Sequence, residues 1–150
     1  MILEAAIKKS IDKCVLCWLA TSSHDHVPNV SPKEIFSCFG AAEIIIANIA
    51  SPQSVRNIRQ NEKVCISFID ILIQKGYQLK GKAVILEKSD PGYDQREMVL
   101  TRMTKGKFPF ASIISIEVNQ VKPIIAPSYI LYPETTEPEQ IESARKTYGI

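Results

Sequence analysis

The sequence has no apolar run long enough to cross a membrane. The best run, residues 44–50, falls far short of the roughly 20 residues that a spanning helix needs. The N-terminus also has no continuous apolar segment followed by a cleavage site, which argues against a secretory signal peptide. We therefore expect a protein with no membrane partner that is located in the cytoplasm, where thiols stay reduced.

Neither sign of charge is in large excess. The chain has 18 Lys and Arg against 16 Asp and Glu, a formal net charge of +2. A protein that coats nucleic acid needs a strongly basic face, so we expect no nucleic-acid partner. An apolar share of 45% and a charged share of 23% are ordinary globular values and argue against disorder. The length of 150 residues predicts a single domain over residues 1–150.

The chain lacks several motifs that identify common sites. It has no G-x-S-x-G, no Walker motif and no dinucleotide-binding glycine pattern. Cys14 and Cys17 have C-x-x-C spacing, but no second pair follows, and a buried strand explains them better than a redox or zinc site. His24 and His26 share an expected turn, where a polar hairpin tip accounts for them as well as a metal would. We predict no metal and no disulfide.

The chain does contain many strand patterns that follow one another directly. The predicted strands are residues 14–21, 29–39, 43–49, 63–69, 77–87 and 111–118, with 123–126 as a candidate extension. The predicted helices are an opening one around residues 3–11, one that begins at Ser51-Pro52, one after Asp90-Pro91 that carries Met98, Val99 and Met103, and a last one after Thr136. Successive strands without intervening helices favour an antiparallel sheet or barrel over a doubly wound parallel sheet.

The segment from Asn48 into the following helix is the first candidate site. Ser51, Gln53 and Ser54 supply side-chain donors in the first turn, and Arg56 follows within one turn. A helix N-terminus presents free N–H groups and a positive dipole end, which suits a phosphate. An ordinary capped helix with solvated arginines explains the same residues, so both interpretations remain open on the residues alone.

Two adjacent charges in an expected strand form the second candidate. Lys33 and Glu34 point to opposite faces, so one of them faces a core or a cavity unless the strand is an exposed edge. Pro32 cannot donate to a sheet ladder and therefore marks an edge or a bulge. The alternative is an edge strand whose charges prevent further strand pairing.

Taken together in order and spacing, several segments resemble the pyridoxamine-phosphate-oxidase-like family of flavin-binding proteins. These segments are residues 19–22 (LATS), 28–33 (PNVSPK), 44–48, 51–58, 61–67 and 79–83. The resemblance covers residues 15 to about 88. It implies a mainly β fold with peripheral helices, an antiparallel split β-barrel of the FMN-binding type. It also implies a homodimer with FMN at the subunit interface.

The resemblance assigns roles to the two candidate sites. The strand that contains Ser31, Pro32 and Lys33 would line the flavin ring, and the segment that contains Asn48, Ser51, Gln53 and Ser54 would hold the ribityl phosphate, with Arg56 close behind. Many members carry an arginine at the position of Ser31 and a lysine at that of Ser54. We therefore expect Arg56 and the helix N-terminus to supply the positive charge.

The implied function is that of an FMN-dependent oxidoreductase acting on an unidentified small substrate. The alternatives are a non-catalytic flavin-binding or carrier protein, and a degenerate split barrel that binds another anionic ligand. The only tryptophan is Trp18, so the chain lacks the Trp- and Arg-containing C-terminal segment of the authentic oxidase. We therefore do not expect it to oxidise vitamin B6.

Overall fold

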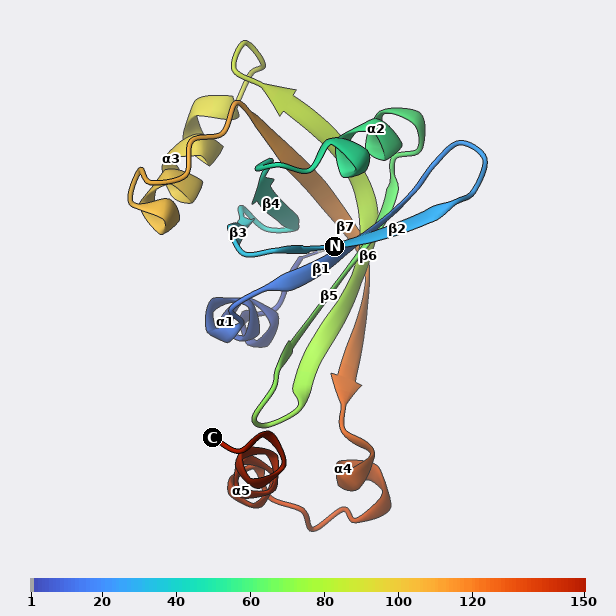
Figure 1. Ribbon diagram of the computed structural model, residues 1–150, viewed down its shortest axis with the longest axis vertical. Helices are drawn as coiled ribbons and strands as arrows, with labels where there is room; N and C mark the ends of the chain where they lie inside the picture. The colour runs from blue at the N-terminus through green and yellow to red at the C-terminus, as the bar shows by residue number, and fades with distance from the viewer. Residues whose placement is uncertain (1) are drawn as a thin grey trace.

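The computed structural model, described for residues 2–150, contains one seven-stranded sheet surrounded by five helices (Figure 1). The strands are β1 (Cys17–Ser22), β2 (Pro28–Lys33), β3 (Phe36–Phe39), β4 (Glu43–Ala47), β5 (Lys63–Asp70), β6 (Lys75–Glu87) and β7 (Ser112–Ile125). The helices are α1 (Ala5–Lys13), α2 (Pro52–Gln60), α3 (Tyr93–Thr104), α4 (Pro127–Leu131) and α5 (Glu137–Tyr148). Neighbouring strands pair antiparallel in the order β2-β1-β5-β6-β7-β4-β3.

The sheet curls into a half-barrel because its two edge strands are neighbours in the chain. β2 ends at Lys33 and β3 begins at Phe36, so only two residues join opposite edges. Extended chain covers at most about 11 Å over this link. The edges of a flat seven-stranded sheet would lie about 29 Å apart. The sheet must therefore roll up, and the predicted antiparallel split barrel is confirmed.

Apolar side chains fill two separate regions. The larger core lies inside the curled sheet and includes Leu19, Ile66 and Leu79, closed by Ile7 and Ile11 of α1. A smaller core joins the other face of β4 and β7 to α3. β4 is buried on both faces, as its run of isoleucines predicts. Within residues 2–150, no helix is long and apolar enough to cross a membrane.

The predicted single strand over residues 29–39 is wrong. It is two strands, β2 and β3, separated by a bend at residues 34–35. The pattern of alternation runs through this bend, and only the curvature of the whole sheet breaks it. In contrast, the segments predicted over residues 111–118 and 123–126 form one long strand, β7, which spans Ser112–Ile125 and pairs with β6 along its length.

One smaller prediction also needs correction. The strand predicted to begin at Cys14 begins at Cys17, and Cys14 instead ends α1. Burial raises the pKa of the Cys17 thiol to about 12, so it stays protonated and unreactive at neutral pH. The helix predicted after Asp90-Pro91 is α3, and it carries Met98, Val99 and Met103 as predicted. Its buried residues include Tyr93 and Leu100, which turn toward the sheet, whereas Met98 and Met103 are exposed.

Candidate functional site

Lys33 is the most unusual residue of the site because it is a buried cation. Its side chain is only 5% exposed, whereas its neighbour Glu34 is exposed, so Lys33 is the one that faces inward. The ammonium donates a hydrogen bond to Ser51 Oγ. Among residues 2–150, no carboxylate forms an ion pair with it. Burial lowers the pKa of Lys33 from its usual value, which means that the charge lacks compensation.

The N-terminus of α2 lies at the end of the Lys33 side chain. Ser51 is the N-cap residue, but its hydroxyl donates to Ile49 O at 3.1 Å and caps no backbone N–H. Pro52 occupies the first turn and has no N–H. The amides of Gln53 and Ser54 precede the first intrahelical hydrogen bond, from Val55 N to Ser51 O. Lys33 and this helix end therefore form one electropositive corner.

The structure brings a second pair of the predicted residues together. Ser31 Oγ of β2 lies 3.2 Å from Ser54 Oγ of α2, and Ser54 is 1% exposed. The two serines stand where the resemblance places basic residues, and they hold the strand and the helix together by a neutral contact. Lys33, rather than a residue at position 31 or 54, therefore supplies the buried positive charge at this corner.

The other predicted residues contribute less directly. Arg56 is exposed on α2, and its Nη2 donates to Gln53 Oε1 at 2.7 Å. Gln53 in turn donates to Asn57 Oδ1 at 2.8 Å. Pro32 is exposed on β2, an edge strand of the sheet, as its missing N–H predicts. Arg56 therefore lies one turn behind the helix start, within reach of solvent.

Asn48 links the site to β7. Its Nδ2 donates to Ser112 Oγ at 2.8 Å, while its Oδ1 is buried and, within the described chain, lacks a hydrogen-bond partner. Two residues later, Ala50 has a φ of 50°, in the left-handed region that costs a non-glycine residue energy. An unpaired buried acceptor and a strained backbone occur together just before α2, a combination typical of binding sites.

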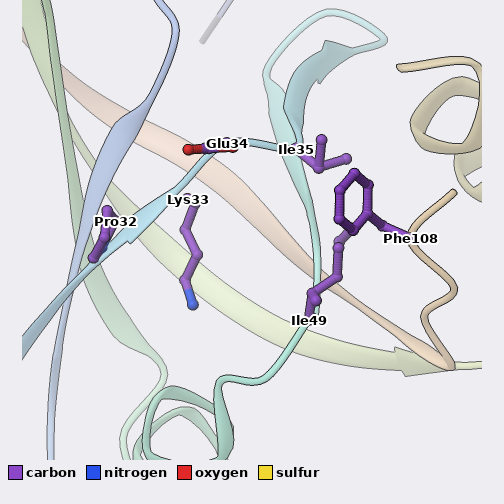
Figure 2. A pocket seen from close by; sticks show the side chains of 7 residues that line it. Pro32, Lys33, Glu34, Ile35, Ile49 and Phe108 are labelled. Atoms are coloured by element: carbon purple, nitrogen blue, oxygen red, sulfur yellow. The ribbon is translucent and has the colours of Figure 1, made fainter. Parts of the chain in front are cut away.

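A cavity of about 210 Å³ adjoins Lys33 (Figure 2). Its lining is Pro32, Lys33, Glu34, Ile35, Ala47, Ile49 and Phe108. Figure 2 shows the Lys33 side chain extending toward α2, while Ile35, Ile49 and Phe108 gather on the other side. The cavity thus has a cationic end and an apolar end. It is smaller than the roughly 300–1,000 Å³ of typical small-molecule sites.

Two contributors to the site, Phe108 and Asn57, are not among the residues predicted from the sequence. Phe108 comes from the loop between α3 and β7 and reaches the cavity only through the fold. Asn57 is 1% exposed and donates to Thr21 Oγ1 at 3.0 Å, which fastens α2 to β1. A polar residue on the inner face of an amphipathic helix was the available clue to Asn57.

The comparisons with known proteins identify the family of the chain. The sequence pattern of the family described as Pyridoxamine 5'-phosphate oxidase matches residues 3–124. The chain belongs to the pyridoxamine 5'-phosphate oxidase family. Among curated proteins, none matches the chain.

Solved structures show the same fold at low sequence identity. HupZ of Group A Streptococcus, as its H111A variant, has 23% identity and a TM-score of 0.69, over 82% of this chain and 99% of that one. An FMN-binding protein of Syntrophomonas wolfei has 15% identity and a TM-score of 0.66, over 78% and 82%. HutZ, described as a heme storage protein of Vibrio cholerae, has 19% identity and a TM-score of 0.64, over 83% and 95%. Members of one fold therefore carry different ligands.

The residues at this corner of the pyridoxamine 5'-phosphate oxidase family member could hold a phosphate group. A phosphate dianion would compensate the charge of Lys33 and accept from the amides of Gln53 and Ser54. The unpaired Asn48 Oδ1 suits a hydroxyl or N–H donor of the ligand. The apolar end of the cavity suits an aromatic ring.

Proposed function

We propose that this protein binds FMN as a homodimer, with the phosphate held between Lys33 and the N-terminus of α2. The observation that carries the proposal is the buried lysine, which faces a helix N-terminus and, among residues 2–150, has no acidic partner. Flavin bound there would supply one- and two-electron transfer. The protein would supply orientation, and a small organic substrate would be reduced or oxidised beside Phe108.

Binding assays with flavins of different charge test the proposal. We expect apoprotein to bind FMN at least about tenfold more tightly than riboflavin, because each charge-assisted hydrogen bond contributes about 1.5–3 kcal/mol and about 1.4 kcal/mol is a factor of ten. Quenching of flavin fluorescence on titration measures both affinities. Equal affinities for FMN and riboflavin would contradict a phosphate site at this corner.

Haem is the competing ligand to include in the same assay, given HutZ. The two histidines of the chain, His24 and His26, are exposed at the β1–β2 hairpin, and within residues 2–150 neither lines the cavity. His24 Nδ1 instead lies 3.1 Å from Gln60 Oε1. We therefore expect haemin to bind without the visible spectrum of axial histidine ligation. A histidine-ligated spectrum that His24→Ala and His26→Ala abolish would contradict the flavin assignment.

The homodimer has its own test. One chain offers a cavity of about 210 Å³, so a partner surface is needed to enclose a flavin. We expect sedimentation equilibrium to show a species with twice the mass of one chain, which is 16.8 kDa. A species at the single-chain mass with undiminished FMN affinity would contradict an interfacial site.

Photoreduction followed by reoxidation with candidate acceptors then separates an oxidoreductase from a flavin carrier.

The affinity for FMN should depend on pH in a way that Lys33 determines. It should rise as the phosphate loses its second proton near pH 6. It should fall again in alkaline solution, beginning below the usual lysine pKa because burial lowers that of Lys33 in the free protein. Only the protonated lysine attracts the dianion, and binding costs the energy of protonating a neutral one.

Fluorescence titrations across this pH range measure the effect. Lys33→Arg is the matched variant, because arginine keeps its charge and should shift the alkaline decline to higher pH. Riboflavin binding should show neither limb. An alkaline decline that is unchanged in Lys33→Arg would assign the titration to another group.

A further inference from the structure

A second cavity, of about 300 Å³, lies at the other end of the molecule from α2. Its walls come from α1, the β5–β6 turn, the end of β7 and the start of α5. Figure 1 shows α5 beside the β5–β6 turn at the lower end of the molecule. Ile73, Tyr77, Pro123, Ile124 and Ile125 make much of the floor apolar. The cavity is separate in sequence and in space from the Lys33 corner.

The rim of this cavity carries positive charge that the chain does not neutralise. Lys9 and Lys13 lie one turn apart on α1 and both line the cavity. In the described part of the chain, neither forms an ion pair. The two acids of the lining are already engaged. Asp70 Oδ1 accepts from Leu72 N, and Glu137 pairs with Lys75 at 3.0 Å.

The wall formed by the C-terminal tail is held by specific contacts. Tyr129 donates to Ile73 O at 2.7 Å, and the Lys75 ammonium lies 4.4 Å from the centre of the Tyr129 ring. Lys75 also reaches Glu137, so one lysine ties α4 and α5 to the start of β6. Residues 125–150 lie outside the family match of residues 3–124. The tail therefore adds Glu137 to the lining of a cavity whose other walls come from α1 and the ends of β5, β6 and β7.

We propose that this cavity binds a small amphipathic carboxylic acid, with its apolar chain on the floor and its carboxylate at Lys9 and Lys13. The charge pattern favours an anion, because the lining contains the three lysines Lys9, Lys13 and Lys75 against the two acids Asp70 and Glu137, and Glu137 is paired with Lys75. The volume selects a small molecule rather than a peptide, since about 300 Å³ is the lower limit of typical ligand sites. The ligand site does not depend on flavin binding.

Octanoate is the probe for this site, and octanol, with the same chain and no charge, is its control. We expect octanoate to shift the amide NMR signals of residues that line the cavity, such as Lys13, Gly76 and Tyr77, with saturation. Octanol should bind about tenfold more weakly, which corresponds to about 1.4 kcal/mol of binding free energy. Signals of Lys33 and Ser54 should not move.

The charge is tested by the double variant Lys9→Gln/Lys13→Gln. We expect it to bind octanoate about tenfold more weakly and octanol as well as before. Lys8→Gln is the matched control on the same helix, because Lys8 Nζ donates to Gly40 O at 3.3 Å and does not line the cavity. FMN affinity should be unchanged in both. Equal binding of octanoate and octanol, an unaffected double variant, or shifts centred on Lys33 would overturn the proposal.

Discussion

Replacement of Lys33 by methionine should weaken FMN binding by about 10- to 100-fold and leave riboflavin binding nearly unchanged. Methionine keeps the length and apolar stem of the side chain but removes the charge that faces Ser51 and the start of α2. The variant would lose one charge-assisted contact between the lysine and the phosphate, whereas the flavin ring would keep its apolar contacts with Ile49 and Phe108. The ratio of the FMN affinity to the riboflavin affinity, measured by fluorescence titration, isolates the contribution of this lysine–phosphate contact.

The same substitution should make the apoprotein more stable, by about 1 kcal/mol in the free energy of unfolding. Lys33 is buried without an acidic partner among residues 2–150, and its lowered pKa shows that the fold disfavours its charge. Below the lowered pKa, unfolding releases this charge into water, so removing it stabilises the folded state. A residue that lowers the free energy of unfolding but raises the affinity for a ligand is typical of a binding site.

Urea unfolding of the apoprotein measures this second effect. Lys63→Met, on an exposed position of β5, is the control and should change neither stability nor the affinity ratio appreciably. A Lys33→Met variant that loses stability and binds FMN as tightly as the wild type would show that Lys33 is a structural residue.

The sequence predicts the architecture well because each strand buries its own alternate residues. In β6, Leu79, Gly81 and Ala83 are buried while Lys80 and Lys82 are exposed, and this alternation is visible without the structure. Helix starts are equally local, as the capping box of Thr136 and Glu139 shows. These features depend on neighbours in the chain and can be predicted from it.

The site is less predictable because its contacts join distant segments. Phe108 and Lys33 line one cavity although 75 positions separate them in the sequence. Glu34 and Lys33 are equally polar, and only the closure of the sheet at residues 34–35 decides which of them is buried. The candidate residues were found by composition and resemblance, whereas their pairing, such as Ser31 with Ser54, required the fold.

Truncation of Glu43 should lower the free energy of unfolding by about 2–3 kcal/mol, since it leaves a largely buried arginine without its partner. Glu43 opens β4 and receives two hydrogen bonds from Arg96 of α3, at 2.6 and 2.7 Å, and one from Ser115 of β7 at 2.6 Å. Both side chains are about one-fifth exposed, at 20% and 19%. Arg96 also stacks on Phe39, 4.3 Å from the ring centre.

This pair holds α3 against the sheet, and α3 leads directly into the loop that carries Phe108. Glu43→Ala should therefore be compared with Glu87→Ala, which breaks the ion pair between Glu87 and Arg59. This second pair is exposed, since the side chains of Arg59 and Glu87 are 61% and 50% exposed. We expect the second change to cost no more than about 0.5 kcal/mol, because water screens an exposed pair. Urea unfolding of both variants, and of Arg96→Met alone and combined with Glu43→Ala, yields the coupling energy. Equal losses for Glu43→Ala and Glu87→Ala, with no coupling between Glu43 and Arg96, would mean that apolar contacts of Tyr93 and Leu100 alone fix α3.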